Sequence, residues 1–142
     1  MRLLVRSVGV MAVAAIAGAG ISQVAAHHSA SMFDVMRTEV LKGKALELRW
    51  VNPHVTLAVK GTLKSGEAPA EWLIETTSPG NLTRLDEGWQ RDAVRPGEDV
   101  EVVFRPLRQP GKRLGLLRQV TTLSNGRVYA SNLRDQERAD LE

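Results

Sequence analysis

The stretch "WLIETTSPGNLTRLDEG", residues 72–88, decides the fold, because the spacing of its apolar residues changes halfway along. In its first half, Trp72, Ile74 and Thr76 alternate with their neighbours. Alternation with a period of two is typical of a strand that buries one face. We therefore predict a strand over residues 72–76.

The second half of the stretch has the period of a helix. Ser78 followed by Pro79 is typical of a helix start, because Ser caps the first turn and Pro fits its first position. Leu82 and Leu85 follow three residues apart, on one face of a helix. We predict one short helix from Pro79 to Glu87.

Segments on both sides of this stretch have the alternation and composition of strands. Turn residues separate them, and Asn125-Gly126 is the strongest hairpin signal in the chain. The further predicted strands cover residues 39–50, 55–59, 100–104, 114–123 and 128–130.

The first predicted strand is long and has a glycine in its middle. Val40, Leu46, Leu48 and Trp50 share one parity, so we expect them to face the core. Gly43 indicates a bulge or a bend, which small barrels use to turn corners.

The order of elements favours one class of fold. A single short helix lies between the third and fourth strands, and no segment is long enough for a βαβ crossover. We predict an all-β protein, a small OB-like Greek-key barrel of five to six strands with one short helix. A two-sheet β-sandwich is the alternative.

The start of the chain predicts export. Arg2 and Arg6 precede an apolar run from Val8 to Ile21, which is too short to span a bilayer readily. Small residues at positions 24 and 26 favour cleavage after Ala26. A cut after Ser22 and an uncleaved anchor are the alternatives. We thus divide the chain into a signal peptide (1–26), one barrel domain (27–133) and a charged tail (134–142).

Composition limits the function of the mature chain. Removal of residues 1–26 leaves 116 residues and lowers the net charge from +3 to +1, which does not favour nucleic-acid binding. The absence of cysteine excludes disulfides, thiolate metal sites and cysteine nucleophiles. No phosphate-binding loop or hydrolase motif occurs. A copper oxygenase also uses an N-terminal histidine, but it normally needs a larger substrate platform than 116 residues with one tyrosine supply, so we expect no enzymatic activity.

The three histidines fall in two motifs, "HHS" at 27–29 and "WVNPH" at 50–54. If cleavage follows Ala26, His27 offers its α-amine and its ring Nδ1 to one metal ion. A third nitrogen from His54 completes a set that suits copper. His28 is the remaining candidate ligand, but on an extended arm it points to the other side.

Several motifs also resemble a family of small exported bacterial proteins that is catalogued only as a domain of unknown function. The resemblance covers most of the mature chain, and "WVNPH" is its most specific part. It implies an exported single domain and supplies no activity. The matching positions are His27, His28, Ser29, Phe33, Asp34, Trp50, Val51, Asn52, Pro53, His54, Ser78, Pro79, Leu82, Gly88, Trp89, Pro96, Gly97, Asn125, Gly126 and Arg127.

These observations predict an exported binding module, periplasmic or secreted, with copper bound by His27 and His54. The alternative is a domain that binds a non-metal ligand or a periplasmic protein at the barrel rim. We expect a monomer without a stable membrane span after signal cleavage. A basic stretch is a further candidate for contact with an acidic partner or anionic lipid, and consists of Arg105, Arg108, Lys112, Arg113 and Arg118.

Overall fold

The structure of the protein is a computed structural model, which describes residues 30–85 and 87–131. The predicted signal peptide, His27, His28 and the predicted charged tail lie outside the described residues. The described elements are a 3-10 helix η1 (Ala30–Met32), β1 (Glu39–Arg49), β2 (Thr56–Thr62), β3 (Ala70–Glu75), α1 (Pro79–Arg84), β4 (Asp99–Pro106), β5 (Leu114–Thr122) and β6 (Arg127–Ala130).

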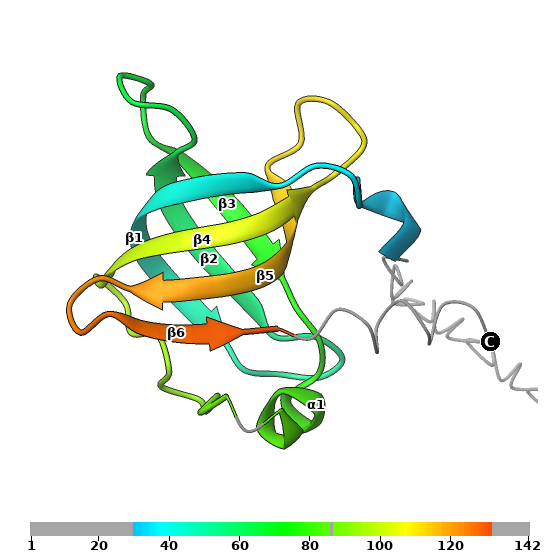
Figure 1. Ribbon diagram of the computed structural model, residues 1–142, viewed down its shortest axis with the longest axis vertical. Coiled ribbons are helices and arrows are strands. Elements are labelled where there is room, and N and C mark those ends of the chain that lie inside the picture. The colour runs from blue at the N-terminus through cyan, green and yellow to red at the C-terminus, as the bar shows by residue number, and fades with distance from the viewer. Residues whose placement is uncertain (1–29, 86, 132–142) are drawn as a thin grey trace, which may run out of the picture.

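The strands form one sheet that closes into a barrel (Figure 1). The hydrogen-bonded order is β3-β2-β1-β4-β5-β6, and a parallel pairing of β3 with β5 joins the two sides. β1 to β5 thus make a closed five-stranded barrel, and β6 is an extra strand beside β5. The predicted OB-like barrel is confirmed, and the two-sheet sandwich is wrong because the two sides of the sheet are hydrogen-bonded to each other.

Alternating side chains of the strands fill the barrel. The burial patterns of β2 and β4 alternate almost without exception, as expected for strands with one face in a core. Leu82 of α1 is fully buried and closes one end of this core. Of the three tryptophans, Trp89 is buried, and Trp50 and Trp72 pack against the core.

The prediction for the inner face of β1 is wrong in its first half. Val40 and Leu46 are 38% and 39% exposed, whereas Leu41 and Ala45 are in the core. The register of β1 against β2 shifts between Ala45 and Glu47, so Leu46 is the extra residue of a bulge. The bulge reverses the parity that faces inward, and Leu48 is accordingly packed against the core as predicted.

Gly43 lies two residues before this bulge, and its lack of a side chain also matters for strand packing. It pairs with Gly61 of β2, and a Cβ on Gly43 would lie 2.2 Å from the backbone oxygen of Lys60. The glycine pair therefore permits a close approach of the β1 and β2 backbones.

The helix begins at Pro79 as predicted but ends at Arg84 rather than Glu87. The Ser78 side chain accepts a hydrogen bond from the Asn81 amide, and the Leu85 amide closes the last turn on Leu82. Beyond this end, Trp89 is buried and docks on the barrel wall. Its Nε1 donates to the Ala130 carbonyl at 2.6 Å.

Candidate functional site

The "WVNPH" motif forms the loop between β1 and β2, with a cis peptide bond between Asn52 and Pro53. The loop is fixed at its end by Val55, which is fully buried. The Val55 amide donates to the Thr77 carbonyl at 3.0 Å, and the Thr76 amide donates to the Val55 carbonyl at 2.9 Å. These bonds hold the residue that precedes Val55 beside the end of β3.

That residue is His54, and its ring contacts a carboxylate of β3. Nδ1 of His54 lies within hydrogen-bonding distance of Oε1 of Glu75. The Glu75 side chain is only 7% exposed, whereas the His54 side chain is 28% exposed. A neutral imidazole that donates its Nδ1–H group to the carboxylate keeps Nε2 as an acceptor. The arrangement therefore fixes the orientation of the ring and leaves one nitrogen for a ligand.

Sequence reasoning missed Glu75. The sequence feature that could have identified it is a carboxylate within a stretch of apolar and β-branched residues, between Ile74 and Thr76. Ile74 faces the core, so Glu75 lies on the outer face of the same strand. Its burial there requires cover from outside the barrel, and His54 contributes to that cover.

The segment that follows "HHS" is the second part of the candidate site. Phe33 is only 1% exposed and forms a small apolar cluster with Leu107 and Leu116, outside the main core. Met32 packs against this cluster, so the arm has an apolar anchor although residues 30–32 lack an aromatic.

Backbone hydrogen bonds fix the same segment to the end of β4. The Asp34 amide donates to the Pro106 carbonyl at 2.8 Å, and the Arg108 amide donates to the Met32 carbonyl at 2.9 Å. The side chain of Arg108 also donates from Nε to the Phe33 carbonyl at 3.1 Å. The "FD" motif therefore holds the described end of the N-terminal arm on the barrel wall, beside β5 (Figure 1).

The two parts meet on the outer face of the β3–β5 seam. Glu75 pairs with Leu116 across the seam, and Leu116 is one of the residues that Phe33 contacts. Neighbouring strands lie about 4.8 Å apart, so the His54–Glu75 pair and the Phe33 cluster occupy adjacent positions. The sequence indicated both motifs, and the seam brings them together.

Within the described residues, no group of three or more His, Cys, Asp or Glu side chains is placed to hold a metal ion. His54 and Glu75 alone are thus an incomplete metal site. The other predicted ligands, His27 and His28, lie outside the described residues. No helix in the described part of the chain is long and apolar enough to cross a membrane.

A comparison with known protein families matches residues 13–118 to a family described as "Family of unknown function (DUF6152)". No curated protein and no solved structure matches the chain. The family match confirms the predicted resemblance to a family without an established activity.

Proposed function

Because the chain belongs to the DUF6152 family, whose function is unknown, we propose a function from the geometry around His54. We propose that the protein is an exported periplasmic module that binds one Cu(II) ion. The ligands are the α-amine and ring Nδ1 of His27 and the ring Nε2 of His54. Three nitrogens in this arrangement suit copper.

The observation that carries this proposal is the contact between His54 Nδ1 and the buried Glu75 carboxylate. Histidines that bind metals generally donate their second ring N–H to a carboxylate or a carbonyl. This hydrogen bond selects the tautomer with a free Nε2 and fixes the orientation of the ring. The partial exposure of the ring leaves Nε2 accessible to an ion.

The length of the arm supports the proposed ligand set. His27 precedes the buried anchor Phe33 by six positions. Ala30–Met32 form the 3-10 helix η1, which rises only about 2.0 Å per residue, so the segment spans at most about 16 Å. Phe33 contacts Leu116, whose partner across the seam is Glu75. The reach of the arm therefore exceeds the short separation between the anchor and the His54–Glu75 pair.

The chemistry of the α-amine gives the proposed site a pH dependence. An α-amine has a reference pKa of about 7.7 and binds metal only after losing its proton. Copper affinity is therefore expected to fall as the pH drops below neutral. His28 remains outside the chelate, because adjacent residues of an extended arm point to opposite sides.

A copper titration of matched proteins tests the proposal. The series contains the mature chain that begins at His27, the same chain with one additional N-terminal residue, His54→Ala and His28→Ala. The additional residue keeps every side chain but removes the free-amine chelate, so we expect it to weaken binding more than His28→Ala does. His54→Ala is expected to leave a weaker two-nitrogen site.

Intact-mass measurement of the exported protein tests the premise that the mature chain begins at His27. A cut after Ser22, or no cut, removes the chelate and contradicts the proposal. Equal copper affinity in the mature, extended and His54→Ala proteins also contradicts it. The domain would then be assigned to binding of a non-metal ligand or a protein at the barrel rim.

A further inference from the structure

The loop between β4 and β5 and the turn after Phe33 form one basic end of the barrel, which the His54 site does not use. Hydrogen bonds from Asp34 to Pro106 and from Arg108 to Met32 join the turn to the loop. Figure 1 shows the loop and the turn together at the upper right of the barrel. We define the basic end by Val35, Met36, Arg108, Lys112 and Arg113.

Positive charges predominate at this end of the barrel. Between Glu101 and Asp135 the sequence contains seven Lys and Arg residues and no acidic residue. The two acidic side chains near the turn already have partners: Asp34 accepts from the Met36 amide, and Glu39 pairs with Arg37 at 2.6 Å.

The three cations of the loop have no such partners in the described ranges 30–85 and 87–131. Among the described residues, Arg108, Lys112 and Arg113 form no ion pair with a carboxylate, and all three are exposed. Arg108 uses Nε for the Phe33 carbonyl, which leaves its terminal nitrogens available. Within the part of the chain that the structure describes, the loop therefore presents three positive charges to solvent that no carboxylate pairs with.

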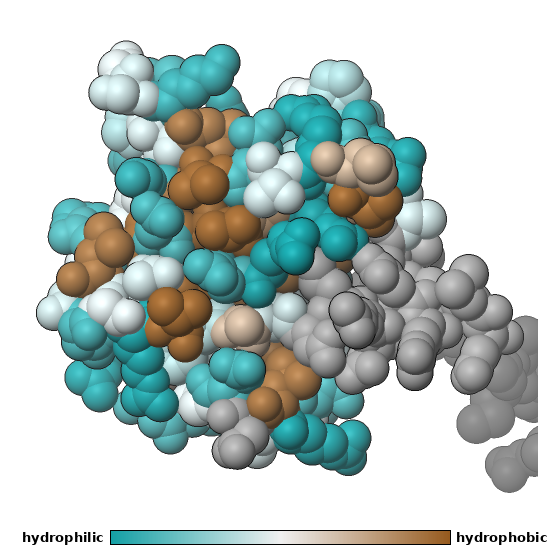
Figure 2. Space-filling model, viewed as in Figure 1, coloured by the Kyte–Doolittle hydropathy of each residue, from teal (hydrophilic) through white to brown (hydrophobic). Residues whose placement is uncertain are grey.

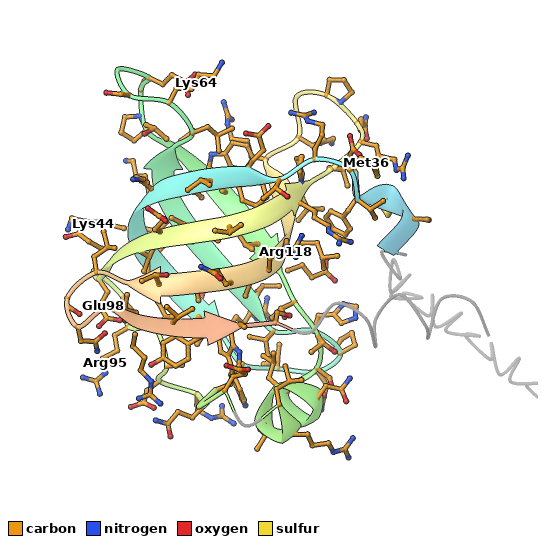
Figure 3. The ribbon with its side chains drawn as sticks, in the orientation of Figure 1. Met36, Lys44, Lys64, Arg95, Glu98 and Arg118 are labelled. Atoms are coloured by element: carbon orange, nitrogen blue, oxygen red, sulfur yellow. The ribbon has the colours of Figure 1, made fainter. Side chains whose placement is uncertain are left out.

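Apolar side chains stand beside these charges. Met36 is 90% exposed, the highest exposure among the large apolar residues of the described chain, and Val35 is 41% exposed. Figure 3 places Met36 next to the β4–β5 loop, and Figure 2 shows apolar residues among hydrophilic ones at this end. The anchor of the segment does not use these two exposed side chains, because Phe33 and Met32 make its apolar contacts.

We propose that the basic end docks on the surface of an anionic phospholipid bilayer. Cations near such a surface are attracted to its negative potential, and an exposed Met inserts its thioether among the lipid head groups. A protein partner with an acidic patch would meet the same charges, but it would also need an apolar pocket shaped for Met36, whereas a bilayer accepts any protruding apolar side chain. The binding expected from three cations and one apolar tip is weak and reversible.

Vesicle cosedimentation of the mature chain tests this docking without reference to copper. The probes are vesicles of phosphatidylcholine alone and of an equimolar mixture with phosphatidylglycerol. We expect binding to the anionic vesicles only, and loss of binding at high salt because salt screens exposed charges.

Substitutions assign the binding to the basic end. Lys112→Gln/Arg113→Gln is expected to weaken partitioning about 25-fold, or about fivefold for each charge removed. Met36→Ser is expected to weaken it about tenfold, because the inserted apolar group is lost. The matched control, Lys64→Gln/Arg95→Gln, removes one Lys and one Arg from other loops (Figure 3) and is expected to change binding less than twofold, an approximate limit for remote surface charges.

Two results would overturn the proposal. One is a wild-type protein that stays in the supernatant with anionic vesicles at low ionic strength. The other is an equal effect of the control and the Lys112→Gln/Arg113→Gln protein, which would indicate attraction by net charge alone. Because Lys112, Arg113 and Met36 are exposed, their variants are expected to fold normally, and a far-ultraviolet spectrum checks this. Neither result bears on the copper proposal.

Discussion

The β1–β2 loop and the β4–β5 loop belong to the same barrel but are held by different means. The first is held at its own end, by buried Val55 and by the contact of His54 with Glu75. The second is held by another segment, through Phe33, while its cations remain exposed. A ring fixed against a buried carboxylate suits selective binding of a small ion, whereas exposed cations suit a diffuse anionic surface.

The largest effect is expected from removal of the anchor of the β4–β5 loop. Phe33→Ala deletes a buried ring from the cluster with Leu107 and Leu116, which typically lowers the free energy of unfolding by about 3–5 kcal/mol. Urea unfolding of the mature chain measures this loss. Met36→Ala, three residues later and exposed, serves as the control and should change stability by less than about 0.5 kcal/mol.

Equal stability of the Phe33→Ala and wild-type proteins would show that the arm does not hold the loop. The β4–β5 loop would then be held by its own residues, as the β1–β2 loop is. His27 would then also lack the fixed point near His54 from which the arm extends.

A smaller loss of stability is expected from a change in the His54–Glu75 contact, which holds the β1–β2 loop. Glu75→Gln keeps the shape and an acceptor for His54 Nδ1 but removes the charge, and we expect a loss of about 1–2 kcal/mol in unfolding free energy. Loss of the carboxylate behind a metal-binding His weakens metal affinity about 10–100-fold. Parallel urea unfolding and copper titration measure the two effects.

Glu71→Gln is the matched control for this experiment, since Glu71 lies on the same strand and is exposed. A copper affinity equally reduced in both variants would indicate a general charge effect. An affinity unchanged in Glu75→Gln would leave the His54–Glu75 contact with a structural role only.

The smallest effect on stability is expected at the tip of the β4–β5 loop. Lys112→Gln/Arg113→Gln removes two exposed charges without an ion-pair partner among the described residues, so we expect a change within about 0.5 kcal/mol. Thermal unfolding of this variant beside the wild type measures it. A clear loss of stability would mean that these cations serve the fold and would weaken their assignment to a membrane surface.

Local patterns determined most of the architecture. Every predicted strand is present with ends within three residues of the predicted ones, and α1 begins at the predicted Pro79. These features follow from neighbouring residues, because alternation, the Ser-Pro start and the Asn-Gly turn act over a few positions. The single helix between the third and fourth strands favoured the OB-like barrel, and the β3–β5 pairing then excluded the sandwich.

Features that depend on contacts between distant segments were not predictable in the same way. The bulge at Leu46 reversed the inner face of β1, and the docking of Trp89 on Ala130 accompanied the early end of α1. Both are set by the fit of one segment against another, which a local period does not report.

The candidate site also combines features that were predictable from local sequence with contacts that were not. The sequence by itself determined that His54 follows a Pro-containing loop and that "HHS" and "FD" stand close together in the chain. Only the tertiary structure decided that Glu75 lies against His54, and that Phe33 packs one strand away from Glu75. The physical reason is closure of the barrel: pairing of β3 with β5 joins segments about 40 residues apart in sequence, a separation over which local periodicity carries no information.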